Sequence, residues 1–255
     1  MRRATSWLFG AVVLVGTLIV ASTASAQDPS SLASRPLVTL LALGILTLVP
    51  FVFMTATSFV KISIVFSILR NALGAGQVPS GAIVSALAMI LTLYVMAPVG
   101  SEIADAVAPS VAHVNANDPL AGDSSDAVMA AIRDGKEPLR RFLKNNANPR
   151  EIRLFLDLAR RSRHADQRDA VTADDFLVVL PAFLITELSE AFQIGFLVFL
   201  PFLVVDMVVA NVLLALGMHM LSPTTVSLPF KLLLFVLVDG WYLLSRALVL
   251  GYNTG

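Results

Sequence analysis

Four strongly apolar stretches occur along the chain, arranged as two pairs. They cover residues 37–69, 82–99, 176–216 and 226–250. Within the first pair, a short segment that contains Gly74 and Pro79 marks a turn between the two stretches. This arrangement predicts two helical hairpins in a membrane, one over residues 37–99 and one over residues 176–255.

A polar segment, residues 100–175, separates the two hairpins and carries most of the charged side chains. Charged and apolar residues alternate in it at helical spacing, for example over residues 151–158. Such a pattern is typical of a folded helical module that faces water. We therefore expect an all-α membrane protein in which two broken helical hairpins flank a helical soluble insert.

The apolar stretches are longer than simple membrane spans require. Residues 37–69 would extend roughly 50 Å as one helix, whereas the hydrocarbon core of a bilayer is about 30 Å thick. Pro50 predicts a break or kink in this stretch, and Pro181 and Pro201 interrupt the third stretch. Irregular backbone at membrane depth is tolerated only where protein or a water-filled cavity covers it. We therefore expect other protein next to these breaks.

Residues 1–26 have the layout of a secretory signal peptide. Two arginines and an apolar run precede Ala24-Ser25-Ala26, which predicts cleavage before Gln27. A polar spacer follows over residues 27–36. The alternative is an uncleaved first helix, but the apolar run of about 14 residues is short for a span of about 20. The leader places the insert, residues 100–175, in the periplasm; its many basic residues favour the cytoplasm, but that rule is weak for long loops.

Composition narrows the classes of protein that the chain can belong to. Apolar residues make up 56% of the chain and charged residues 14%, which favours lipid over water as the surrounding solvent. The chain has no cysteine, so disulfides and thiol chemistry are excluded. His113, His164 and His219 lack the spacing of metal ligands, and we expect no metal and no cofactor. Lys plus Arg and Asp plus Glu number 18 each, which gives no basic excess for nucleic acid.

Seven charged residues lie within otherwise apolar stretches. They are Lys61, Glu187, Glu190, Asp206, Lys231, Asp239 and Arg246. A charge that faces lipid costs at least about 2.5 to 3.5 kcal/mol. These side chains are therefore expected to pair within the protein, to pair between subunits or to face water in a conduit. Glu187, Glu190, Lys231 and Asp239 are our candidates for pairing between subunits.

No catalytic site is expected. Asp206 and Asp239 lack the flanking residues of an intramembrane aspartyl protease, and no serine-hydrolase, zinc-protease or phosphate-binding motif occurs. A proton-coupled carrier would place membrane acids in paired repeats with matching interruptions. The first arm has one internal lysine and no acid, whereas all the acids lie in the second arm. This asymmetry makes a carrier the less favoured alternative.

Two blocks in the second hairpin carry a family resemblance. Residues 181–196 read PAFLITELSEAFQIGF, and residues 229–241 read PFKLLLFVLVDGW. Both blocks closely resemble signatures of the family formed by the flagellar biosynthesis protein FliP and its injectisome counterpart SctR. Residues 54–66 and 69–74 are similar to the N-terminal hairpin of that family. The resemblance extends over essentially the whole mature chain.

The resemblance implies a non-enzymatic core subunit of the flagellar type III protein export gate. In this family several copies, expected as a pentamer, assemble with FliQ and FliR and adjoin FlhB and FlhA within the lipid of the bacterial inner membrane. Unfolded export substrates then pass through the centre of the gate at the flagellar basal body. Injectisome members usually lack a cleavable leader, so residues 1–26 favour the flagellar branch.

A methionine-rich segment lies between the third and fourth apolar stretches. Met218, His219 and Met220 resemble the segment that the family uses as a gasket to close its pore. Methionine is flexible and polarizable, so a ring of such side chains can seal irregularly and yield to a passing chain. His219 takes a position that is methionine in many relatives, which predicts a polar, pH-sensitive ring unless the side chain turns away. Ordinary core packing is the alternative role for these methionines.

Overall fold

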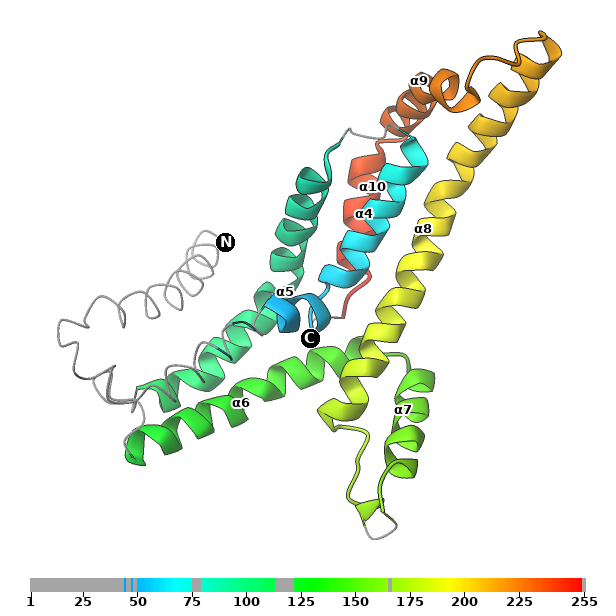
Figure 1. Cartoon of the computed structure of the whole chain (residues 1–255). Coiled ribbons are helices and arrows are strands. Elements are labelled where there is room, and N and C mark those ends of the chain that lie inside the picture. Colours follow the sequence, from blue (N-terminus) through cyan, green and yellow to red (C-terminus); the bar gives the residue numbers. More distant parts are fainter. Residues whose placement is uncertain are drawn as a thin grey trace. The chain divides into compact units, whose positions relative to one another are not determined.

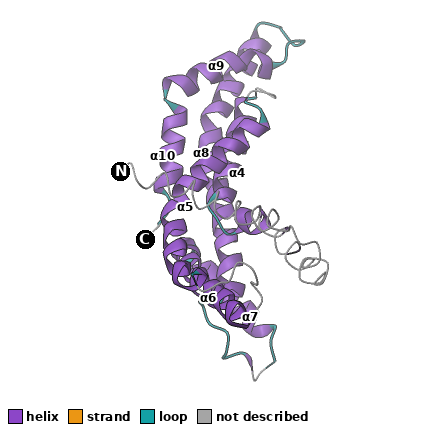
Figure 2. Cartoon of the chain, turned by 90° about the vertical axis from the view of Figure 1, so that its left-hand side faces the viewer, coloured by secondary structure: helices purple, strands orange, loops and turns teal. Residues whose placement is uncertain are grey.

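The computed structural model describes residues 44, 47, 50–74, 79–112, 122–164 and 167–253. Helices make up most of this part of the chain, and it contains no strand (Figures 1 and 2). The prediction of an all-α protein is thereby confirmed. The predicted signal peptide and polar spacer, residues 1–36, lie outside the described residues.

The chain divides into two compact units. Unit 1 comprises Met1–Met54, Met96–Phe142 and Thr254–Gly255, and unit 2 comprises Thr55–Val95 and Leu143–Asn253. Two helices, α5 (Gly81–Val111) and α6 (Gly122–Asn146), begin in one unit and end in the other.

In unit 1 the second half of α5 contacts α6. Arg141 of α6 lies 3.2 Å from a carboxylate oxygen of Glu102 in α5. The two helices approach closely at Gly135, because a Cβ atom there would lie 2.8 Å from a methyl group of Val107. α5 continues through Pro98 without interruption, so the boundary that we expected between hairpin and insert at residue 100 falls inside a helix.

Unit 2 is organised along α8 (Phe176–Ala215), its longest helix. α4 (Phe59–Leu73), α7 (Pro149–Arg161) and α9 (Pro223–Leu237) all contact α8. α4 lies along the middle of α8, and α7 lies beside its N-terminal end (Figure 1). α10 (Gly240–Leu250) follows α9 and reaches α4, where the ring centroids of Trp241 and Phe66 are 6.2 Å apart.

α8 does not break at Pro181 or Pro201, and the chain after Pro50 stays helical for several residues. Residues 50–55 are helical, and the backbone leaves the helix only at residues 56–58. There the hydroxyl of Thr57 accepts a hydrogen bond from the backbone N–H of Phe59 (3.3 Å), an alternative to a helical bond. α8 continues for 40 residues through Pro181 and Pro201. A proline removes one backbone bond and bends a helix, but the remaining backbone bonds on either side keep α8 continuous.

Two helices, α5 and α8, are long and apolar enough to cross a membrane. α9 and α10 meet at 59° and would form a third span if they are counted as one. α4 has only 15 residues, fewer than the roughly 20 that a span requires. The four apolar stretches therefore provide two or three candidate spans among the described residues, and the chain is an all-α membrane protein.

The hydrophobic core of unit 2 lies where α4, α5, α8, α9 and α10 meet. α4 contributes buried residues at helical spacing, including Ile62, Phe66 and Leu69. Gly195 of α8 permits close contact with α4, because a Cβ atom there would overlap the side chain of Ile68. One face of α4 is therefore apolar because protein covers it.

Gly240 is required by the bend between α9 and α10. It follows Asp239, whose backbone is left-handed (φ 51°, ψ 50°). A Cβ atom at Gly240 would overlap the ring of Phe235, which packs edge-on against Trp241 with centroids 5.1 Å apart. Gly240→Ala is therefore expected to lower the free energy of unfolding by about 1–3 kcal/mol.

Thermal unfolding of the detergent-solubilised protein, followed by tryptophan fluorescence, measures this effect. Gly44→Ala is the control, because a Cβ atom there would meet no atom within 4 Å. Equal melting temperatures for the two variants would show that Gly240 is not required for the contact with Phe235.

Candidate functional site

The first cluster of charges joins α4 to α8. The Lys61 Nζ lies 2.9 Å from an oxygen of Glu187 and 2.6 Å from an oxygen of Glu190. Glu187 and Glu190 are three residues apart on α8 and therefore project from the same face. The Lys61 and Glu187 side chains are 3% and 0% exposed, whereas that of Glu190 is 45% exposed. A buried ion pair thus opens on one side, at Glu190.

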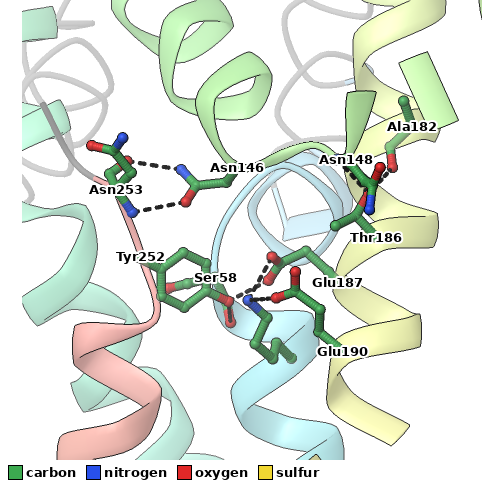
Figure 3. A network of polar contacts seen from close by, with 10 residues as sticks. Ser58, Asn146, Asn148, Ala182, Thr186, Glu187, Glu190, Tyr252 and Asn253 are labelled. Carbon is green, nitrogen blue, oxygen red and sulfur yellow. Dashed lines mark hydrogen bonds and ion pairs between the residues drawn. The ribbon is translucent and has the colours of Figure 1, made fainter. Parts of the chain in front are cut away.

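Tyr252, just beyond α10, completes this cluster. Its hydroxyl donates a hydrogen bond to the Glu187 carboxylate and lies 3.3 Å from the carbonyl oxygen of Ser58 (Figure 3). Its ring centroid is 4.1 Å from the Lys61 Nζ, a cation–π contact. Burial and then the nearby Glu187 charge raise the pKa of the Tyr252 phenol. The hydroxyl therefore remains a donor at physiological pH. Sequence patterns gave no signal for Tyr252, because it follows the last apolar stretch as a single polar residue.

A polar cavity of about 240 Å³ adjoins Glu190. Its lining residues are Lys61, Asn145, Asn146, Ala147, Asn148, Thr186, Glu190, Gly251 and Asn253. Asn146 and Asn253 exchange two hydrogen bonds of 2.9 Å, one in each direction (Figure 3). The hydroxyl of Thr186 accepts a 2.9 Å hydrogen bond from the backbone N–H of Asn148. These bonds fix the end of α6, the start of α7 and the C-terminal segment around one hydrophilic space.

The second cluster of charges joins α9 to α8 and to the end of α4. The Lys231 Nζ lies 2.6 Å from an oxygen of Asp206 and donates a 3.0 Å hydrogen bond to the carbonyl oxygen of Ala72. The hydroxyl of Ser227 donates to the other Asp206 oxygen. Ala72 lies in the last turn of α4, where the helix dipole also favours a cation. Lys231 is only 3% exposed, so Asp206 and the Ala72 carbonyl, rather than water, stabilise its side chain.

The structure supplies partners within one chain for most of the charges on the apolar arms. Glu187 and Lys231, for which the sequence suggested partners in another subunit, are paired internally. Among the residues that the structure describes, the side chains of Asp239 and Arg246 are exposed and have no charged or hydrogen-bonding partner. These two, together with the exposed edge of Glu190, are the charges left for contacts outside the chain.

The methionine-rich segment forms the turn between α8 and α9. Gly217 adopts φ 73°, which starts the turn at the end of α8. Met218 is 44% exposed and Met220 is 98% exposed, and His219 is exposed between them. Packing in a core does not explain these methionines, because little of the chain covers them.

Within the part of the chain that the structure describes, no three His, Cys, Asp or Glu side chains come together as metal ligands would. In both clusters a buried lysine is held against carboxylate oxygens by ion pairs. Such pairs fix which helix lies against which, since a mispaired arrangement leaves a buried charge without a partner.

Comparison with known proteins gives matches along most of the chain. Residues 42–248 match the sequence model of the FliP family. Yop proteins translocation protein R of Yersinia pestis is 45% identical over 214 residues, which cover 84% of this chain and 95% of that protein. Hypersensitivity response secretion protein HrcR of Ralstonia nicotianae is 42% identical over 208 residues, or 82% of this chain and 93% of that protein.

A relative from a flagellar system is similar to the same degree. Flagellar biosynthetic protein FliP of Buchnera aphidicola is 43% identical over 230 residues, which cover 89% of this chain and 56% of that protein. The matched residues 42–248 include both charge clusters apart from Tyr252, and the methionine-rich turn.

Proposed function

Since the chain belongs to the FliP family of type III secretion translocation proteins, we propose that it is a core subunit of a type III protein export gate. Several copies, expected as a pentamer, assemble with FliQ and FliR into the channel, and FlhB and FlhA adjoin it. Unfolded substrates cross the inner membrane through this channel. The observation that carries the proposal is the family match over residues 42–248.

The surface of α8 supports an oligomeric role. Only 11% of its most apolar 18-residue window is buried within the chain. Exposed side chains such as Phe192, Phe196 and Leu197 are therefore available to lipid or to other subunits. An assembly also provides partners for Asp239 and Arg246, which lie unpaired on apolar helices within the described part of the chain.

The methionine-rich turn supports a pore role. Met218 and Met220 project from the turn between α8 and α9 with little cover from their own chain. In a ring of subunits, such turns would converge and close the channel with flexible apolar side chains. His219 would contribute a polar position to that ring.

Two observations favour different substrates for the gate. The signal-peptide-like residues 1–26 favour the flagellar branch, in which the gate exports flagellar substrates at the basal body. The relatives named for Yop translocation and for the hypersensitivity response are matched over nearly their whole length, which favours export of secreted effector proteins. Both candidates share the same gate function and differ in the cargo.

Deletion of the gene in its own host tests the function and separates the two branches. We expect the deletion to abolish type III export, with full restoration by the intact gene in trans. Loss of filaments and motility assigns the chain to the flagellar branch, and loss of effector secretion in motile cells assigns it to the other branch. Normal motility together with normal secretion would contradict the proposal.

A further inference from the structure

Arg246 is a cation on an apolar helix, and it has no partner among the residues that the structure describes. It lies on the side of α10 opposite the buried Leu244 and Leu248. Its neighbours on that side, Tyr242, Leu243 and Leu250, are 56%, 53% and 70% exposed. The result is an exposed apolar strip with a single arginine inside it. Lipid would cover the apolar residues but would leave the guanidinium unpaired, so the strip fits a protein surface that offers an acid.

The cluster at Lys61 carries an excess of the opposite charge. One lysine faces two carboxylates, so Lys61, Glu187 and Glu190 together carry one excess negative charge. Glu187 is fully buried, and the excess is therefore accessible at Glu190, whose side chain is 45% exposed. The polar cavity of about 240 Å³ lies directly beside it, with many times the room that one water molecule needs.

We propose that Arg246 of one copy inserts into the cavity beside Glu190 of a neighbouring copy. The inference rests on the oligomeric gate proposed above and names one contact that holds its copies together. The guanidinium would pair with the Glu190 carboxylate, and its remaining N–H groups would donate to the side-chain carbonyls of cavity asparagines such as Asn146 and Asn148. The excess charge of the cluster and the unpaired charge of the strip then neutralise each other.

The positions of the two groups along the subunit agree with this contact. Tyr252 donates a hydrogen bond to Glu187 and so marks the level of the cluster. Arg246 lies six residues before Tyr252, a rise of roughly 9 Å at helical spacing. A small stagger between neighbouring copies therefore brings the guanidinium level with the cavity. Leu197 lies about two turns beyond Glu190 on the same face of α8 and is 66% exposed, so it provides an apolar surface for the rest of the strip. A contact between copies of this head-to-tail type can close a ring.

The competing acceptor for Arg246 is Asp239, the other exposed acid on the described apolar arms. It lies about 10 Å from Arg246 along the axis, in the opposite direction from Tyr252. Asp239 lines neither the polar cavity beside Glu190 nor the apolar cavity formed by α8 and α9. A chain without cysteine allows the two acceptors to be compared cleanly, because each introduced thiol is unique.

The test uses two differently tagged copies of the full chain, co-expressed in membranes. One copy carries Arg246→Cys, and the other carries Glu190→Cys. A short bismaleimide crosslinker is expected to give a product of two chains for this pair. Asp239→Cys replaces Glu190→Cys in the competing pair, and Arg153→Cys, on the exposed face of α7, replaces Arg246→Cys in the control; neither should react. Crosslinking through Asp239 and not through Glu190 would overturn the proposal.

A second measurement does not depend on thiols. Arg246→Gln and Glu190→Gln are each expected to reduce the yield of intact oligomer about tenfold or more, and the double variant to reduce it no further than either single variant. Additive losses would overturn the contact. If the unmodified chain forms oligomers but neither crosslinking nor coupling occurs, only this contact fails. If the unmodified chain forms no oligomer, the proposed function itself fails.

Discussion

Replacing Glu187 with leucine is expected to destabilise the protein by about 3–5 kcal/mol. The substitution leaves Lys61 buried without its most enclosed partner and leaves the Tyr252 hydroxyl without its carboxylate acceptor. Removing one member of a buried ion pair costs about this much, and Lys61 then keeps only the half-exposed Glu190, 2.6 Å away, as a partner. Since domains are stable by only about 5–15 kcal/mol, this loss is a large fraction of the total, and the amount of protein in the membrane should fall severalfold. Immunoblotting of membranes and thermal unfolding of the purified variant measure both effects.

Two further variants make this result specific. Lys61→Met combined with Glu187→Leu removes both charges, and it should recover much of the lost stability. Glu102→Leu makes the same substitution in the exposed pair with Arg141, where the loss should stay below about 1 kcal/mol. If Glu187→Leu were as well tolerated as Glu102→Leu, the buried cluster would not be a determinant of the fold.

Deleting residues 218–220 is expected to make the assembled gate permeable to small solutes in the absence of cargo. The deletion removes Met218 and Met220, the apolar side chains that project from the turn between α8 and α9. A constriction lined by apolar side chains excludes water and ions, so its loss should increase solute uptake severalfold. Growth in the presence of a normally excluded toxic solute, or ion flux into proteoliposomes that contain the purified gate, measures the change.

Variants of the same turn separate a seal from a structural role. A Gly-Ser-Gly replacement of residues 218–220 keeps the length of the turn and should leak as the deletion does. Met218→Leu with Met220→Leu keeps the apolar bulk and should remain tight. His219→Met should also remain tight. An intact barrier in a deletion variant that still assembles would contradict the gasket.

The sequence predicted which residues carry buried charge more successfully than it predicted their partners. A charge on an apolar stretch stands out because of its cost, and Lys61, Glu187 and Lys231 are indeed buried. The pairing of Lys61 with Glu187 joins residues that are far apart in the chain, so only the packing of α4 on α8 reveals it. No sequence pattern marks the asparagines of the cavity or Tyr252, because each is a single polar residue near an element's end.

Hydropathy does not separate membrane spans from helices that other protein covers, for a related reason. α4 is apolar because Phe66, Leu69 and their neighbours contact other helices of unit 2. Hydropathy indicates only that a segment avoids water. It does not distinguish a segment that contacts protein from one that contacts lipid. Pro181 and Pro201 were expected to interrupt the third apolar stretch, but α8 continues through both as one long helix.

The mass of the complex tests the oligomeric gate most directly. The chain is co-expressed with FliQ and FliR, purified in a mild detergent through a tag on the chain alone, and weighed by native mass spectrometry. We predict a pentamer of this chain with both partners bound. A monomer free of FliQ and FliR would contradict the assignment and would restore the carrier as the better explanation of the charges in the apolar arms.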